Sequence, residues 1–230
     1  MEKIYRDDSE LFALMKAELT TCVVGDVMDK MGLRRQFLPP EVRPLSPDMV
    51  LAGRALPVLE ADYYSDSSDS RGPLAKRGFG LMFEALDDLK PNEVYIASGT
   101  TGAYAMWGEL MATRARMLGA AGAIINGFSR DTKGVLEMGF PTFSRGSYGQ
   151  DQGVRGKVVD FRLPIEVGAA RVEPGAILFG DIDGVLVIPR EAEADVIAGA
   201  IEKVRGEKKV AEAIRAGMST VEAYAKFGIM

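Results

Sequence analysis

The sequence contains no histidine among its 230 residues, and this absence excludes several kinds of active site. Ser-His-Asp and Cys-His catalysis both require an imidazole base, so neither operates in this chain. A metal site built on imidazole ligands is excluded for the same reason. Any bound metal would be held by carboxylate, carbonyl and water oxygens, which favours Mg²⁺ or Mn²⁺ over zinc.

Cysteine is nearly as scarce, because Cys22 is the only one. A single cysteine allows neither an internal disulfide nor a thiolate metal cluster. Its apolar surroundings predict a buried core thiol. This cysteine usage fits a reducing compartment, so we expect a cytoplasmic protein.

Long apolar runs and dense basic blocks are also missing. No segment approaches the ~18 consecutive apolar residues of a membrane span, and we expect no signal peptide at Met1–Lys3. The net charge is −5, and the basic tract 203–209 is interleaved with Glu202 and Glu207, which predicts a solvated helix face. We therefore expect neither a membrane nor a nucleic acid as partner.

The residues that are present favour one globular unit. Hydrophobic residues make up 47% of the chain and the mean hydropathy is +0.01, which suits a single domain over 1–230 with a helical tail from about 191. Helical patterns cover 10–16, 22–31, 81–89, 107–118, 132–138, 191–216 and 218–230. Strand patterns cover 49–59, 93–97, 121–126, 141–144, 157–167, 176–179 and 184–188. This order predicts an α/β fold with a mixed sheet or β-layer, closed by C-terminal helices.

Two polar segments and two short motifs interrupt these elements. The segment 62–80 is rich in serine and aspartate and predicts an exposed excursion, while 146–156 is a loop with four glycines. Gly99-Thr-Thr-Gly102 lacks the lysine of a phosphate-binding loop, so we do not expect a nucleotide. Asp181-Ile-Asp183-Gly184 matches only a fragment of a calcium loop, and a β-turn is favoured.

An arginine and an aspartate stand side by side beyond the strand at 121–126. In an open α/β sheet, ligands bind outside the carboxyl ends of strands. At such a position Arg130 offers a guanidinium for an anion, and Asp131 offers a hard oxygen ligand for a metal. The alternative for these two residues alone is a structural ion pair.

Gly108 and Glu109 begin the helix that lies 21 positions before this pair. The start of a helix presents unpaired amide groups to an anionic ligand, and Gly108 would let that ligand approach the backbone. Glu109 alone is typical of a first-turn residue that stabilises the helix dipole. The helix-turn-strand unit can return Arg130 and Asp131 to the same rim, and such a combination suits enolate chemistry on a 2-oxo acid.

These motifs resemble the RraA-like proteins, which include the 4-hydroxy-4-methyl-2-oxoglutarate aldolases, a group of class II pyruvate aldolases. The resemblance rests first on Gly108-Glu-Leu-Met111, its spacing to Arg130, and the Arg130-Asp131 pair. It extends from about residue 20 to the C-terminus and is strongest between 99 and 190. Further matching motifs are Pro-Thr-Phe-Ser-Arg-Gly at 141–146, Val-Glu-Pro-Gly-Ala-Ile-Leu-Phe-Gly-Asp at 172–181, Asp-Gly-Val at 183–185 and Ala-Ile-Arg-Ala-Gly at 213–217.

The resemblance implies a swivelling α/β/β/α-type domain that assembles as a homotrimer or a dimer of trimers, with active sites between subunits. The backbone amides of the substrate-binding segment would hold a pyruvate carboxylate; that segment consists of Gly108, Glu109, Leu110 and Met111. Arg130 would bind the 2-oxo oxygen and stabilise the enolate, and Asp131 would ligate Mg²⁺ or Mn²⁺. Glu207 would hold metal-bound water in the neighbouring subunit.

The implied activity is a metal-dependent lyase that cleaves 4-hydroxy-2-oxo acids and releases pyruvate, with oxaloacetate decarboxylation as a side activity. Glu109, or a water that it activates, would remove the proton of the C4 hydroxyl. Aldolases of this family usually have aspartate at the position of Glu109. The extra methylene of glutamate moves the carboxylate by ~1 Å, so the resemblance does not identify the substrate. The alternative is a non-catalytic regulator that binds a ribonuclease or helicase.

Overall fold

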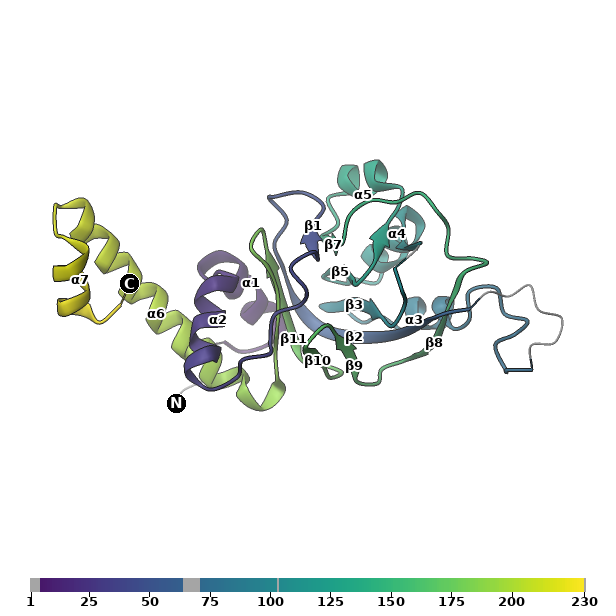
Figure 1. Ribbon diagram of the computed structural model, residues 1–230, viewed down its shortest axis with the longest axis horizontal. Coiled ribbons are helices and arrows are strands. Elements are labelled where there is room, and N and C mark those ends of the chain that lie inside the picture. Colours follow the sequence, from purple (N-terminus) through teal and green to yellow (C-terminus); the bar gives the residue numbers. More distant parts are fainter. Residues whose placement is uncertain (1–4, 64–70, 103, 230) are drawn as a thin grey trace.

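The computed structural model describes residues 5–63, 71–102 and 104–229, and an eight-stranded mixed sheet forms its centre (Figure 1). In spatial order the strands are β1 (Arg43–Pro44), β7 (Thr142–Ser144), β5 (Gly122–Ile125), β3 (Glu93–Ser98), β2 (Leu51–Asp62), β11 (Ile177–Asp181) and β12 (Gly184–Ile188), and β8 (Gly156–Phe161) also pairs with β2. The four strands β7, β5, β3 and β2 are parallel. Their carboxyl ends therefore lie at one edge of the sheet.

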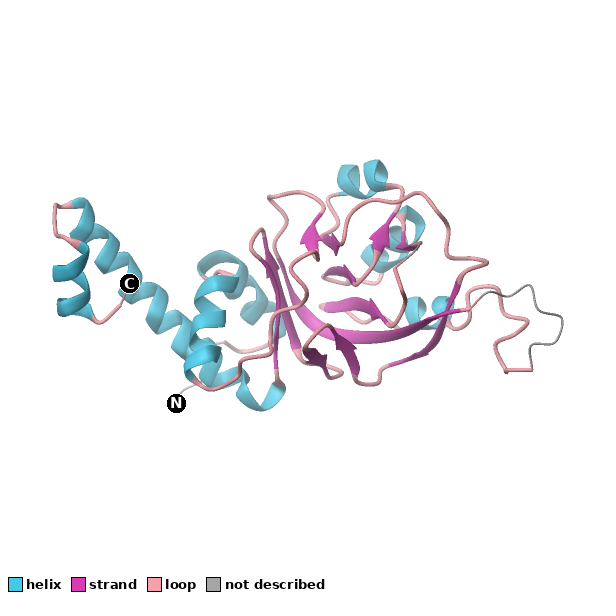
Figure 2. Ribbon diagram, viewed as in Figure 1, coloured by secondary structure: helices cyan, strands magenta, loops and turns pink. Residues whose placement is uncertain are grey.

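Shorter elements surround this sheet. The helices are α1 (Asp8–Glu18), α2 (Thr21–Lys30), α3 (Met82–Asp87), α4 (Glu109–Met117), α5 (Thr132–Met138), α6 (Glu193–Arg215) and α7 (Thr220–Phe227), with a 3₁₀ turn at Arg190–Ala192. Two small pairs complete the fold: β4 (Ala105–Trp107) with β6 (Phe128–Ser129), and β9 (Ile165–Val167) with β10 (Ala170–Val172). Figure 2 shows α6 and α7 extending away from the sheet.

The apolar residues of β2 explain how the layers pack. Ala52 lies in a core with α1, α2 and α6, whereas Leu56 and Val58 lie in a second core with α3, α4 and α5. Because these alternate residues share one face of the strand, both groups of helices cover the same face of the sheet. Leu51 and Ala55 point to the other face and pack beneath the β9–β10 hairpin. The result is a helical layer over a sheet with a second, smaller β-layer behind it.

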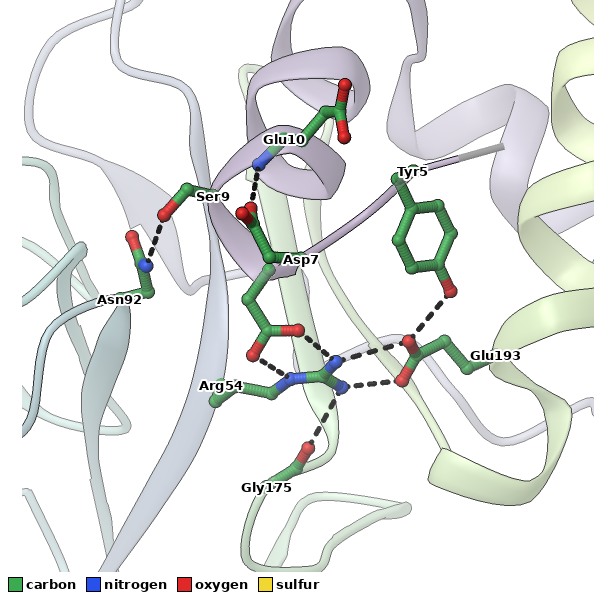
Figure 3. A network of polar contacts seen from close by, with 9 residues as sticks. Tyr5, Asp7, Ser9, Glu10, Arg54, Asn92, Gly175 and Glu193 are labelled. Carbon is green, nitrogen blue, oxygen red and sulfur yellow. Dashed lines mark hydrogen bonds and ion pairs between the residues drawn. The ribbon is translucent and has the colours of Figure 1, made fainter. Parts of the chain in front are cut away.

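A largely buried arginine links the N-terminal and C-terminal helices to β2 (Figure 3). Arg54 Nη2 donates to Asp8 of α1 at 2.5 Å, and Arg54 Nη1 donates to Glu193 of α6 at 2.5 Å. Arg54 also donates to the Gly175 carbonyl at 3.3 Å, and the Tyr5 hydroxyl donates to Glu193 at 3.0 Å. With only 14% of the Arg54 side chain exposed, removal of this guanidinium would leave two carboxylates close together without a counter-charge.

The predicted fold class is confirmed, since α/β alternation gives way to strands and then to C-terminal helices. Thr20 caps α2 through the Val23 amide, and Gly139 ends α5 in a left-handed conformation. Asp181 to Gly184 forms the β11–β12 turn rather than a calcium loop. In the described part of the chain, no helix is both long and apolar enough to cross a membrane.

Three expectations need correction. Cys22 is exposed and not a core thiol, because α2 buries the side that carries Val23 and Val24. The helix predicted at 107–118 begins only at Glu109, since Trp107 ends β4. Lys203 is 10% exposed and pairs with Asp26 of α2, although the rest of the basic tract is largely exposed. The N-terminal residues 1–3 and the excursion residues 64–70 lie outside the described residues.

Candidate functional site

The β4–β6 pair brings the Arg-Asp motif to the start of α4. These strands run parallel with Trp107 opposite Ser129, and the Arg130 amide donates to the Trp107 carbonyl at 2.9 Å. Arg130 and Asp131 come directly after β6, and Gly108 comes directly after β4. The three residues therefore lie beside one another where these two paired strands end. The sequence predicted this juxtaposition, and the structure confirms it.

Gly108 is the residue on which that close packing depends. Its backbone is extended, with φ −161° and ψ −179°, so most residues could adopt it. A Cβ at this position, however, would lie 2.9 Å from Asp131 Oδ2 and 3.4 Å from Arg130 Cγ. No side chain caps α4, so the amides of its first turn remain available to an anionic ligand.

Arg130 lies between two carboxylates. Its Nη1 donates to Asp151 Oδ1 at 2.8 Å, and its Nε lies 3.5 Å from Asp131 Oδ2. The Arg130 side chain is 38% exposed, which leaves the guanidinium accessible to a ligand. The two carboxylates therefore hold the Arg130 guanidinium in position, and the guanidinium stays partly exposed to solvent.

Asp151 was not predicted from the sequence. It lies in the glycine-rich loop 146–156, where its Oδ2 accepts a hydrogen bond from the Gly153 amide at 2.9 Å. The backbone beside it pairs with Ala105 of β4, so the loop is fixed against the site. The only signal in the sequence was an aspartate two positions before a glycine, which is typical of many turns.

Asp131 has an unusual backbone for a residue other than glycine. Its φ is 54° and its ψ is 33°, and its side chain makes no capping bond to α5. This left-handed conformation is uncommon and is tolerated best by aspartate and asparagine. The carboxylate is 47% exposed, so it can accept an additional ligand. Such strain is often found at functional sites.

A cavity of roughly 340 Å³ opens beside these residues. Part of its lining is polar and includes Gly108, Arg130, Asp131 and Asp151. The rest of the lining is apolar and comes from α3, the segment before it, β4 and the start of α4. The apolar lining residues are Phe79, Met82, Phe83, Leu86, Ala105, Met106, Trp107, Leu110 and Met111. Leu110 and Met111 of the predicted substrate-binding segment thus lie at the cavity together with Gly108.

Glu109 does not share this lining. Its carboxylate lies against α5, where a Cβ on Gly134 would come within 2.2 Å of Glu109 Oε2. The structure therefore brings Gly108, Arg130 and Asp131 together but directs the Glu109 side chain to the neighbouring helix. The predicted role of Glu109 as a base stays a prediction, and it requires either a rotated side chain or a bridging water.

Glu207 lies far from the cavity in the same chain. It belongs to α6, where it pairs with Lys203, and Figure 1 shows α6 and α4 in separate parts of the molecule. The role implied for Glu207 concerns a neighbouring subunit. It therefore stays a prediction.

Several buried polar groups are unpaired, and two of them belong to residues that line the cavity, Trp107 and Gln152. Among the described residues, both carboxylate oxygens of Glu60, the Tyr95 hydroxyl, Trp107 Nε1 and Gln152 Nε2 are buried without a hydrogen-bond partner. Burial raises the pKa of the Glu60 carboxyl to about 8, and the Asp62 charge adds to this effect. Trp107 is 1% exposed and packs against Tyr95 and Phe140, so it has a packing role.

The carboxylates at the cavity fit a weakly coordinated divalent cation better than a closed metal cage. In the portion of the chain that is described, no three acidic or thiol side chains converge on one point. Asp131 and Asp151 nevertheless approach the same guanidinium. Mg²⁺ is commonly held by one or two carboxylates, with water and substrate oxygens completing its shell.

Comparisons with known proteins point to one family. A family model described as RraA-like, Aldolase/RraA, matches residues 21–187. A Halalkalibacterium halodurans protein named as a provisional 4-hydroxy-4-methyl-2-oxoglutarate aldolase is 29% identical over 206 residues, or 89% of either chain. A structure described as a novel cellulase from gut-associated microbes is 30% identical, with a TM-score of 0.79 and 90% of both chains covered.

A further solved structure shows likeness in fold alone. The Streptomyces coelicolor protein RraAS2, described as an unusual member of the RNase ES inhibitor RraA family, is 19% identical. The TM-score is 0.74, and the match covers 89% of this chain and 96% of that one.

Proposed function

Because this chain belongs to the RraA-like family, we propose that it is a divalent-metal-dependent lyase that cleaves 4-hydroxy-2-oxo acids and releases pyruvate. The observation that supports this most directly is the meeting of the uncapped α4 start, Arg130 and Asp131 at one cavity. The name of the H. halodurans relative supports the same chemistry. Oxaloacetate decarboxylation, which passes through the same pyruvate enolate, is the expected side activity.

The polar part of the cavity lining suits a 2-oxo acid. The amides of Gly108 to Met111 would bind the substrate carboxylate, because the α4 start offers unpaired donors and a partial positive charge. Arg130 would then donate to the 2-oxo oxygen and stabilise the negative charge that develops there as the C3–C4 bond breaks. Asp151 would hold the guanidinium in position for this interaction.

Asp131 would hold Mg²⁺ or Mn²⁺, since its exposed carboxylate is not used to cap α5. When bound, such a cation supplies Lewis-acid polarisation of the substrate oxygens. Glu109, after rotation from Gly134 or through a water molecule, would accept the proton of the C4 hydroxyl. Protonation of the enolate carbon completes pyruvate.

The test is pyruvate release from 4-hydroxy-2-oxo acids in the presence of Mg²⁺ or Mn²⁺, with EDTA as a control. We expect Arg130→Ala to abolish the activity and Arg171→Ala to preserve it. Arg171 is a matched control because it also pairs with two carboxylates, Glu166 and Glu173, but lies on β10. Absence of pyruvate from every substrate, or full activity in EDTA, would contradict the proposal.

The alternative function is that of a regulator that binds a ribonuclease or helicase. The fold likeness to RraAS2 is compatible with it, but a pure binding module does not require the site geometry described above. A cellulase activity fits less well, because a cavity of roughly 340 Å³ suits a small acid rather than an extended polysaccharide.

We propose that the protein assembles as a homotrimer or a dimer of trimers. Analytical ultracentrifugation would test this assembly.

A further inference from the structure

The cavity lining has a polar part and an apolar part. Gly108, Arg130, Asp131 and Asp151 line one part of the cavity, and under the proposed function they would bind the pyruvate half of a substrate. The remaining volume faces α3 and the segment before it, from which Phe79, Met82, Phe83 and Leu86 line the wall. This wall would face whatever group the substrate carries on C4.

The wall combines a buried base with an aromatic rim. Met82 and Leu86 are each 6% exposed, so they form a packed floor. The rings of Phe79 and Phe83 meet edge to face with centroids 5.6 Å apart, and Phe83 is 58% exposed at the opening. An apolar group bound here would cover these side chains and gain the free energy of removing apolar surface from water.

A charged group would have no counter-charge on this wall. Among the described lining residues, Arg130 is the sole lysine or arginine, and it already faces Asp131 and Asp151. Arg77 and Arg114 lie near α3 but pair with Glu84 and Asp87 and do not line the cavity. Against the wall that one chain supplies, a second substrate carboxylate would lose hydration without gaining a cation, which is unfavourable.

We propose that the substrate of this lyase carries an apolar alkyl or aryl group on C4, so that its second product is an apolar aldehyde or ketone. This inference rests on the proposed retro-aldol function. The C4 hydroxyl loses its proton, the C3–C4 bond breaks, and C3 gains a proton to give pyruvate without any change in overall oxidation state. The substrate thus differs from 4-hydroxy-4-methyl-2-oxoglutarate, the compound in the name of the relative, which has carboxylates at both ends.

A matched substrate pair tests this inference. In 4-hydroxy-5-methyl-2-oxohexanoate, an isopropyl group replaces the second carboxylate of 4-hydroxy-2-oxoglutarate at similar size. We expect kcat/KM for the isopropyl compound to be at least about tenfold higher. Phe83→Arg should reduce this preference by about tenfold or more, whereas Tyr224→Arg, which changes an aromatic residue of α7 with 61% exposure, should leave it unchanged. Equal or higher kcat/KM for the dicarboxylate would overturn the inference.

A binding measurement separates this inference from the lyase proposal. Trp107 is the only tryptophan and lines the cavity, so its fluorescence reports occupancy without turnover. The uncleavable analogue 5-methyl-2-oxohexanoate should bind at least about tenfold more tightly than 2-oxoglutarate. Tighter binding of 5-methyl-2-oxohexanoate without pyruvate release from any substrate would support the apolar site and contradict the lyase function. Pyruvate release together with tighter binding of 2-oxoglutarate would support the lyase function and contradict the apolar site.

Discussion

Arg130 Nη1 donates to Asp151 Oδ1 at 2.8 Å, so a carboxylate from a distant loop fixes the guanidinium at the cavity. Asp151 is itself fixed by the Gly153 amide. Arg130 thus has a defined position before any substrate binds. Pre-organisation of this kind is a large part of electrostatic catalysis, and it suggests how the site can be dissected.

Replacement of Asp151 should impair catalysis through Arg130. We expect Asp151→Ala to lower kcat about 10- to 100-fold, because an unheld guanidinium samples positions away from the 2-oxo oxygen. Steady-state kinetics with circular dichroism would measure this. Asp160→Ala, in β8, is the control and should behave like the unchanged protein. An unchanged kcat in Asp151→Ala would show that Arg130 does not need this partner.

Gly108→Ala should inactivate the enzyme without unfolding it. The extended backbone accepts alanine, but the new Cβ would lie 2.9 Å from Asp131 Oδ2 and displace the proposed metal ligand. We expect a loss of kcat on the order of 100-fold with little change in Tm. Gly78→Ala, where no atom lies within 4 Å of the new Cβ, is the control. Unaltered activity in Gly108→Ala would argue against a role for this contact.

The position of Glu109 can be changed without altering Glu109 itself. A Cβ on Gly134 would occupy the place of the Glu109 carboxylate, so Gly134→Ala should drive this exposed side chain off α5. We expect kcat to stay the same or rise if Glu109 acts from a rotated position, and helix propensity should add up to about 1 kcal/mol of stability. Glu109→Gln should lower kcat. Equal kcat in Glu109→Gln and the unchanged protein would remove Glu109 as the base.

Glu60 should make the protein less stable as the pH rises. Burial raises its folded-state pKa from the ordinary value of 4.5 to about 8, so the folded state binds more protons than the unfolded state between these values. The free energy of unfolding therefore falls as pH increases from about 4.5 to about 8, by up to a few kcal/mol. The neighbouring titratable groups are Asp62, Tyr95 and Tyr104, all acidic, so none offsets this effect.

Urea unfolding at pH 5 and pH 8 would measure the contribution of Glu60. Relative to the unchanged protein, Glu60→Gln should gain stability at pH 8 but not at pH 5, whereas exposed Glu41→Gln should show no such difference. A difference in unfolding free energy between Glu60→Gln and the unchanged protein that is the same at both pH values would contradict the buried, protonated state of Glu60.

The Arg54 network should dominate the attachment of the terminal helices. Arg54→Met should lower the free energy of unfolding by on the order of 3 kcal/mol, because Asp8 and Glu193 would face each other without a counter-charge. Arg171→Met removes an arginine that also pairs with two carboxylates but is 60% exposed, and we expect a loss below about 1 kcal/mol. Similar losses in the two variants would contradict this account.

Local sequence patterns predicted much of the fold and part of the site. The helix that follows Gly108, the strand at 121–126 and the helix at 132–138 follow from periodicity, which is a local property, although the start of α4 was predicted two residues too early. Cys22 was misplaced although α2 buries Val23, Val24, Val27 and Met28 on one side. The helical spacing of these four residues places Cys22 on the opposite, exposed side of α2.

The remaining features depend on tertiary contacts. Asp151 lies in a loop without periodicity, and only its pairing beside Ala105 brings it to Arg130. The direction of Glu109 depends on the space that Gly134 leaves on another helix. Neither contact has a signature within the local sequence.

The central claim is that this chain stabilises a pyruvate enolate, and proton exchange tests it without knowledge of the physiological substrate. The measurement is loss of the pyruvate methyl signal in D₂O with Mg²⁺, followed by proton NMR. We predict exchange that stops with EDTA and in Arg130→Ala but continues in Arg171→Ala. Absence of exchange in the unchanged protein, or equal exchange in Arg130→Ala, would contradict the account.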